Sequence, residues 1–189
     1  MRVIAGSARR LNLKAPEGLD TRPTTDRIKE TLFNILMPEI PGCRFLDLFA
    51  GSGGIGIEAL SRGAREAVFV ENNRKAVSII QENLTFTRLS DRARVMGTDA
   101  VTAIRQLSGK GSFDIIFMDP PYRNSLYAPV LSALQTSDVL GSGTLVIAES
   151  LSGMDFSFAE DLGFDIVRVK DYKSNKHVFL SRSEKPAFQ

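Results

Sequence analysis

The sequence predicts an α/β fold: a mostly parallel, seven-stranded sheet with helices on both faces and an antiparallel β-hairpin at its C-terminal end. Three observations indicate this fold. From residue 43 onward, apolar strand-like runs alternate with helix-like segments, which is typical of a parallel sheet. A glycine-rich turn joins the first of these strands to the first helix. The last two strand-like runs are separated only by a polar segment, which indicates a hairpin.

Each element can be assigned from its residue pattern. Apolar runs predict strands at residues 43–49, 66–71, 94–97, 113–118, 143–149, 163–170 and 177–182. Periodic segments between the first five strands predict helices at residues 52–62, 73–89, 99–108 and 126–136. In the second of these helices, apolar residues recur at spacings of three and four, namely Ala76, Ile79, Ile80 and Leu84.

The first 40 residues precede the alternating pattern. Residues 2–13 predict a short basic hairpin or arm. Thr24 and Thr25 are candidate N-caps for a helix at residues 26–36. We therefore expect an N-terminal extension followed by the main domain, at residues 1–40 and 41–189 respectively.

The composition excludes several classes of protein. Cys43 is the only cysteine and His177 the only histidine. This excludes a disulfide framework, a zinc cluster and a Cys/His or Ser/His/Asp nucleophilic site, so we expect no metal. No apolar run approaches the roughly 20 residues that span a bilayer, and the first residues lack the apolar core of a secretory signal. We therefore expect a cytoplasmic protein without a membrane role.

The charge is uneven along the chain, although the net charge is only +2. Residues 1–30 hold seven Lys/Arg and four Asp/Glu, and residues 165–189 hold six and three. A basic arm is the electrostatic footprint of a protein that binds a phosphate backbone. A solvated terminus with a small positive bias would give the same counts.

Asp119, Pro120, Pro121 and Tyr122 directly follow the apolar run at residues 113–118. This turn indicates a site that methylates a planar amine, whose nitrogen is a poor nucleophile because its lone pair is delocalised. A carboxylate and a backbone carbonyl on a proline-locked turn can accept hydrogen bonds from both N–H groups of the amine, while an aromatic ring stacks on the base. A turn that merely ends a strand is the alternative interpretation.

The glycine-rich turn predicts a nucleotide-cofactor site. Gly51, Gly53 and Gly56 allow close backbone approach, and Glu71 lies twenty residues beyond Gly51, where a ribose hydroxyl would bind. These residues fit NAD as well as S-adenosylmethionine (SAM). Asp47, just before the turn, favours SAM because a carboxylate attracts its cationic amino-acid end and repels a pyrophosphate.

Asp99 follows the third predicted strand. Its carboxylate could accept a hydrogen bond from an adenine amino group, with the backbone of Ala100 nearby. It could equally be the N-cap of the next helix, and the two roles are compatible.

With these motifs in register, residues 43–182 resemble a Rossmann-like class I SAM-dependent methyltransferase. The N-terminal motifs narrow the resemblance to the RsmD family of 16S rRNA guanine-N2 methyltransferases: Arg2-Val-Ile-Ala-Gly6 and Arg22-Pro-Thr-Thr-Asp26-Arg27-Ile-Lys-Glu30-Thr-Leu-Phe33. The family methylates the exocyclic amine of one guanine, position 966, on an assembling 30S particle. The resemblance therefore implies SAM as methyl donor, S-adenosylhomocysteine (SAH) as product and 16S rRNA within a 30S subunit as partner. We expect a monomer.

The resemblance also implies residue roles. Asp119 and the Pro120 carbonyl would hold the guanine amine, with Pro121 stiffening the turn and Tyr122 stacking on the base. The cofactor would be held by Asp47, Phe49, Gly51, Ser52, Gly53, Glu71, Asn72, Asp99 and Ala100. The RNA would be contacted by Arg9, Arg10, Arg22 and Arg27. Arg27 could instead form an ion pair with Glu30 on an exposed helix.

The chain departs from the family pattern at three expected glycines, where it has Ala5, Arg9 and Lys173. These changes bear on local turns and RNA contacts. An adenine-N6 or protein-glutamine methyltransferase could use a similar proline turn, because each target is also a planar amine. A nicotinamide dehydrogenase would leave that turn unexplained, and a non-catalytic RNA-binding module would not need the acidic residues that this chain retains.

Overall fold

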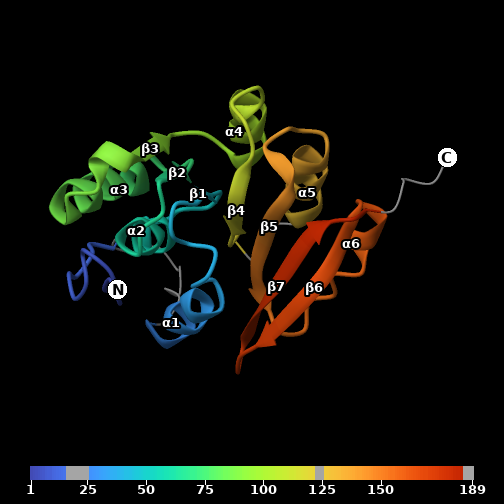
Figure 1. The fold of residues 1–189 in the computed structure, drawn as a ribbon, viewed down its shortest axis with the longest axis horizontal. Helices are drawn as coiled ribbons and strands as arrows, with labels where there is room; N and C mark the ends of the chain where they lie inside the picture. The colour runs from blue at the N-terminus through green and yellow to red at the C-terminus, as the bar shows by residue number, and fades with distance from the viewer. Residues whose placement is uncertain (16–25, 122–125, 185–189) are drawn as a thin grey trace. The chain divides into compact units, whose positions relative to one another are not determined.

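The computed structural model describes residues 1–15, 26–121 and 126–184. The chain divides into two compact units, Met1–Asp99 and Ala100–Gln189. Strands β1 to β3 belong to the first unit and β4 to β7 to the second, and all seven are labelled in Figure 1. Together these are the seven strands that the sequence predicts.

The first unit contains three parallel strands in the order β3-β2-β1. Strand β1 pairs with β2 from Arg44↔Glu66 to Asp47↔Phe69. Phe45, Leu46 and Phe69 are fully buried, as expected for parallel strands that are covered on both faces. The elements of this unit are α1 (Asp26–Ile35), β1 (Arg44–Asp47), α2 (Gly54–Ser61), β2 (Glu66–Val70), α3 (Arg74–Thr87), the short 3₁₀ helix η1 (Ser90–Arg92) and β3 (Ala93–Met96).

Helix α3 confirms the predicted apolar stripe. Ala76, Ile80 and Leu84 are buried and Ile79 is half-buried, whereas the charged residues of the helix lie outside this stripe. The helix begins after Asn73, whose side chain accepts hydrogen bonds from the amides of Lys75 and Ala76 at 2.9 and 3.2 Å. A capping side chain of this kind satisfies donors that have no partner within the helix.

The second unit contains four strands in the order β4-β5-β7-β6. Strand β4 runs parallel to β5, whereas β7 is antiparallel to both β5 and β6, so the predicted C-terminal hairpin is confirmed. Its elements are α4 (Ala100–Leu107), β4 (Phe113–Met118), α5 (Tyr127–Gln135), β5 (Leu140–Leu151), α6 (Phe158–Asp161), β6 (Phe164–Asp171) and β7 (Asn175–Arg182).

Several predicted boundaries differ from the structure. The helix predicted from residue 52 begins at Gly54, because Gly51 and Gly53 have φ values of 54° and 82°, which interrupt a right-handed helix. Strand β5 extends beyond the predicted 143–149, since Leu140 pairs with Phe113 on β4. The sequence did not predict the four-residue helix α6.

The N-terminal arm, residues 1–15, has less regular structure than the predicted hairpin. One isolated antiparallel bridge, Arg2↔Asn12, joins its two sides. The predicted N-caps Thr24 and Thr25 lie outside the described residues. The arm and α1 belong to the same compact unit as β1 to β3.

Within the described ranges, no helix is long and apolar enough to cross a membrane. The same residues contain no group of three or more His, Cys, Asp or Glu side chains arranged to hold a metal ion.

Candidate active site

Asp47 ends β1 and is buried, with 1% of its surface exposed. Its Oδ2 atom accepts a hydrogen bond from the amide of Gly56 at 3.2 Å. Burial raises the pKa of this carboxyl to about 7, and the nearby charge of Glu71 acts in the same direction, whereas the amides of Gly56 and Phe49 oppose the shift. Its Oδ1 atom is buried and has no hydrogen-bond partner among the described residues.

The glycine turn is fixed by Glu71, the residue that follows β2. One carboxylate oxygen of Glu71 accepts from the amide of Gly51 at 2.9 Å. The other accepts from the amide of Asn73 at 2.8 Å. The predicted ribose-binding carboxylate thus also fixes the position of the turn relative to the start of α3.

Gly56 allows α2 to pack closely on the sheet. A Cβ atom at this position would lie 2.3 Å from the ring of Phe69 on β2. The glycine therefore permits the close approach of helix and strand that the third glycine of the fingerprint provides. Its amide donates to Asp47, so one residue fixes both the packing of α2 and the orientation of the buried carboxyl.

Asn83 on α3 is a buried residue that the sequence reasoning missed. Its Nδ2 atom donates to the carbonyls of Ser52 and Lys14 at 2.9 and 3.0 Å, and its Oδ1 accepts from the amide of Lys14 at 2.9 Å. The residue therefore joins the cofactor turn to the end of the N-terminal arm. Its place next to Leu84, on the apolar stripe of α3, is the signal that could have identified it.

The remaining predicted cofactor residues are found in three places. Phe49 is half-buried two residues after the end of β1, and Asn72 is exposed between β2 and α3. Asp99 is exposed and is the last residue of the first unit, directly before α4. Ala100 is buried as the first residue of α4, in the second unit.

The Asp119 turn follows β4, as predicted. Asp119 is half-buried, Pro120 is buried and Pro121 is exposed. Strand β4 itself is buried at five of its six residues, so the turn begins from a rigid base. Tyr122 lies outside the described residues.

The N-terminal arm carries the predicted RNA-contacting residues Arg9 and Arg10, both exposed. Arg10 has a φ of 70°, in the left-handed region that non-glycine residues seldom adopt. Gly6 is required for close packing, because a Cβ there would lie 1.8 Å from the carbonyl oxygen of Ser61. Arg27 is exposed on α1, and Arg22 lies outside the described residues.

Glu58, in the middle of α2, anchors this arm. Its carboxylate accepts from the amides of Ile4 and Ala5 at 2.8 and 3.0 Å. It also pairs with Lys29 of α1 at 3.1 Å and with Arg62 at 2.8 Å. Ala5, at an expected glycine, therefore still provides an anchoring amide. A glutamate in the otherwise apolar run of α2 is the sequence signal that could have revealed this clamp.

Lys29 is fully buried and completes the clamp. Its ammonium group also donates to the carbonyl of Arg2 at 2.6 Å. Burial lowers the pKa of Lys29, and the charge of Glu58 opposes that shift. The clamp of Glu58, Lys29 and Arg62 thus joins the arm, α1 and the helix that follows the cofactor turn.

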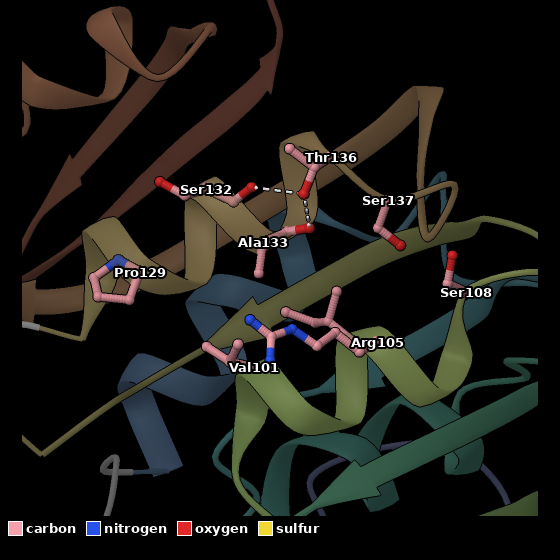
Figure 2. A pocket seen from close by; sticks show the side chains of 9 residues that line it. Val101, Arg105, Ser108, Pro129, Ser132, Ala133, Thr136 and Ser137 are labelled. Atoms are coloured by element: carbon pink, nitrogen blue, oxygen red, sulfur yellow. Dashed lines mark hydrogen bonds between the residues drawn. The ribbon is translucent and has the colours of Figure 1, made fainter.

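The two described grooves lie away from most predicted site residues. One, of about 610 Å³, is in the second unit between α4 and α5, and Figure 2 shows the side chains of both helices that line it. The other, of about 560 Å³, lies between the arm and α3 and is lined by Lys14, Phe86 and six polar residues. Among the described residues, no predicted catalytic, cofactor or RNA residue lines either groove.

The buried carboxyl of Asp47 fits a cationic cofactor better than an anionic one. A buried acceptor atom without a partner favours a ligand that donates hydrogen bonds, such as an ammonium group. Pyrophosphate offers only acceptors and negative charge, so it would be repelled by an ionised Asp47. The residues present therefore fit SAM.

Comparison with known proteins gives an independent assignment. The model of the family described as "Conserved hypothetical protein 95" matches residues 1–181. The chain belongs to this family. It is 42% identical over 150 residues to "Putative rRNA methyltransferase YlbH" of Bacillus subtilis, a match that covers 79% of this chain and 82% of the relative. It is 39% identical over 151 residues to "Ribosomal RNA small subunit methyltransferase D" of Escherichia coli K12, covering 79% and 74%.

A solved structure of a family relative confirms the fold. "Putative methyltransferase yhhF from Escherichia coli" superposes with a TM-score of 0.83 at 32% identity, over 98% of this chain and 99% of that one. The predicted class I methyltransferase fold is therefore confirmed, and so is the resemblance on which the family prediction rests.

Proposed function

We propose that this protein is a SAM-dependent methyltransferase that methylates the exocyclic N2 amine of one guanine, position 966, in the 16S rRNA of the small ribosomal subunit. Relatives named as small-subunit rRNA methyltransferases, which the chain matches over about three quarters of their length, support the substrate class. The choice of guanine N2 rests on the resemblance to the RsmD family, because the Asp119 turn by itself fits any planar amine.

The observation that carries the cofactor assignment is the buried Asp47 carboxyl at the end of β1. In the proposed complex, its Oδ1 atom accepts from the cationic amino-acid end of SAM. Glu71, already held by two backbone amides, accepts from the ribose hydroxyls through lone pairs that those amides leave available. Gly51 and Gly53 let the ligand approach the backbone closely. The carboxylate of Asp99 accepts a hydrogen bond from the adenine amino group.

The proposed acceptor site is the Asp119 turn. Asp119 and the Pro120 carbonyl accept hydrogen bonds from the two N–H groups of the guanine amine. These bonds orient the lone pair of the nitrogen. Because the amine gains positive charge as it reacts, a fixed carboxylate stabilises the transition state more than the ground state. Stacking by Tyr122 stays a prediction.

When bound, SAM supplies an electrophilic methyl group on a sulfonium. The guanine nitrogen would form a bond to the methyl carbon as the carbon–sulfur bond breaks, with the electron pair of that bond remaining on the sulfur of SAH. Asp119 then accepts, or passes to water, the proton that the methylated nitrogen must lose. No side chain of the protein acts as a nucleophile, so alignment and electrostatic stabilisation supply the catalysis.

The target guanine has to leave its stack to reach Asp119, which requires a few kcal/mol unless the RNA already exposes it. We therefore propose a folded ribonucleoprotein, the assembling 30S subunit, as the true substrate. Arg9, Arg10, Arg22 and Arg27 would then meet phosphates, which position the RNA without reading its sequence.

The test is methyl transfer from labelled SAM into purified, unmodified 30S particles, followed by mass analysis of the nucleosides. We expect N2-methylguanosine at a single site with the wild-type protein and none with Asp119→Ala. SAH affinity, measured by calorimetry, should be unchanged in that variant because Asp119 does not hold the cofactor. N6-methyladenosine, or label in ribosomal protein, would overturn the guanine assignment and leave the cofactor assignment intact.

A further inference from the structure

Glu149 is a buried glutamate on β5 that the proposed reaction does not use. Only 2% of its surface is exposed. One carboxylate oxygen accepts from the amide nitrogen of Asn175 at 2.6 Å, and the other lies 3.1 Å from Nε2 of His177. His177 Nδ1 lies 3.0 Å from the hydroxyl of Tyr172. We refer to these four residues, Glu149, Asn175, His177 and Tyr172, as the Glu149 cluster.

The direction of the hydrogen bonds to Glu149 follows from its carboxylate. An ionised carboxylate can only accept, so the side-chain amide of Asn175 and Nε2 of His177 both donate to it. Burial, and then the charge of Glu149, raise the pKa of Tyr172 to about 12, so its hydroxyl keeps its proton beside Nδ1 of His177. Both oxygens of Glu149 therefore accept, and the carboxylate is held in one orientation.

Strand register places Glu149 beside the proposed acceptor turn. On the parallel strands β4 and β5, Met118 pairs with Ala148. Asp119 directly follows β4 and Glu149 is the next residue of β5, so their backbones are neighbours at the same end of these two strands. The ring of Phe117 packs edge-on against His177, with centroids 6.1 Å apart, which places the cluster directly against β4.

Glu149 also forms a hydrogen bond with the start of α5, the helix that follows the Asp119 turn. Tyr127, the first residue of α5, is 3% exposed, and its hydroxyl donates to the backbone carbonyl of Glu149 at 2.7 Å. The chain therefore leaves β4 next to Glu149 at Asp119 and is bonded to Glu149 again at Tyr127. Glu149 is therefore a neighbour of both Asp119 and Tyr127, the residues where the chain leaves β4 and enters α5.

We propose that Glu149 is a positioning residue for methyl transfer. Its backbone carbonyl and its oriented side chain hold the ends of the segment that carries Asp119, and its charge adds to the negative field that Asp119 presents to the target amine. Preorganised charges of this kind act where positive charge develops in the transition state. The inference rests on the proposed function, because it takes Asp119 as the group that holds the amine.

The test compares two variants of the full chain, Glu149→Gln and Tyr127→Phe, with Glu160→Gln as the matched control. Glu160 is exposed on α6 of the same unit. The turnover number and the KM for unmodified 30S particles are measured at saturating SAM, well below the melting temperature of each variant. Turnover is expressed per SAH-binding site counted by calorimetry, so that loss of folded protein does not count as loss of catalysis.

We expect Glu149→Gln to lower kcat about tenfold or more while the KM for particles and the affinity for SAH stay within about twofold. Tyr127→Phe keeps the charge and should lower kcat by about threefold or more. Glu160→Gln should match the wild type. A merely structural role would lower the melting temperature and the number of binding sites but not kcat per site.

Wild-type kcat per site in Glu149→Gln would overturn the inference. If Glu149→Gln does not fold, the test rests on Tyr127→Phe. An unchanged kcat in Tyr127→Phe would then overturn the inference. Failure of the proposed function would look different: the wild-type protein would then put its methyl group on another nucleoside or on protein. The same variants compared on that product would still show whether Glu149 positions Asp119.

Discussion

Each unit of the protein has a buried glutamate with a different set of partners. Glu58, in the first unit, meets two cations and two backbone amides. Glu149, in the second, meets a side-chain amide and a histidine ring. Their exposed fractions are nearly equal, at 0% and 2%. The partners, rather than the degree of burial, therefore distinguish the two residues.

The difference indicates different roles. A buried carboxylate that is matched by cations contributes to the fold, because removing it leaves those cations buried without a counter-charge. Lys29 is such a cation, with no side-chain exposure. Glu149 is held instead by Asn175 and His177, and its backbone neighbours that of Asp119 at the end of β4. The clamp of Glu58, Lys29 and Arg62 anchors the arm, whereas we propose that the Glu149 cluster serves methyl transfer.

Glu58→Gln gives the largest expected effect on stability. The amide would leave the buried Lys29 without its counter-charge, so the free energy of unfolding should fall by about 3–5 kcal/mol. Glu149→Gln should cost only about 1–2 kcal/mol, because its partners are an amide and an imidazole. Urea unfolding followed by circular dichroism measures both values.

Glu66→Gln is the matched control for this comparison. Glu66 pairs with Arg44 at the start of strands β2 and β1, and its side chain is 42% exposed. A half-exposed pair contributes about 0–1 kcal/mol, so the control should change little. Equal losses in Glu58→Gln and Glu149→Gln would remove the distinction between the two units.

Gly56→Ala tests how closely the first unit is packed around the cofactor turn. The new methyl group would lie against the ring of Phe69, so we expect a loss of about 1–3 kcal/mol and weaker binding of SAH. Gly143→Ala is the control in the second unit, because a Cβ there has nothing within 4 Å. Calorimetric melting and SAH titration of both variants provide the comparison, and a fully tolerated Gly56→Ala would contradict the packing argument.

The pH dependence of cofactor binding tests a third buried carboxyl, Asp47. Its pKa is raised to about 7, so in the protein without cofactor it becomes neutral as the pH falls below that value. SAM affinity should therefore fall between about pH 7 and pH 5, approaching tenfold per pH unit, while the amino group of SAM stays protonated. Titration calorimetry should show a flat profile over this range in Asp47→Asn.

The raised pKa of Asp47 affects the stability of the cofactor-free fold in the opposite direction from cofactor binding. A carboxyl whose folded pKa is raised stabilises the fold at low pH and loses that contribution as the pH rises from its ordinary value of 3.8 to about 7. Stability without SAH should therefore fall over this window more in the wild type than in Asp47→Asn. The reverse order would contradict the burial of Asp47.

The smallest expected effect is on the arm. Arg10→Gly removes one positive charge and relieves a φ of 70°, so stability should rise by up to about 1 kcal/mol while RNA affinity falls severalfold. The salt dependence of binding to 30S particles should decrease by about one unit of slope if Arg10 meets a phosphate. Unchanged affinity and slope would remove Arg10 from the proposed RNA surface.

Periodicity and glycine placement predicted most of the fold. The alternation from residue 43 onward gave the seven strands and the terminal hairpin, because buried parallel strands need continuous apolar runs that few other structures use. Boundaries next to glycines were less accurate, since Gly51 and Gly53 delay the start of α2 through their positive φ values. These are local properties, and a sequence records them directly.

The family and the two turns, at Gly51 and Asp119, were also evident from the sequence, because motifs of a few residues carry their own chemistry. Only the tertiary structure revealed the residues that hold those turns. Asn83 meets Ser52 across 31 residues, Glu58 meets Ile4 across 54, and Glu149 meets His177 across 28. A buried polar side chain takes whichever partner the fold brings within about 3 Å, and that partner has no fixed spacing along the chain.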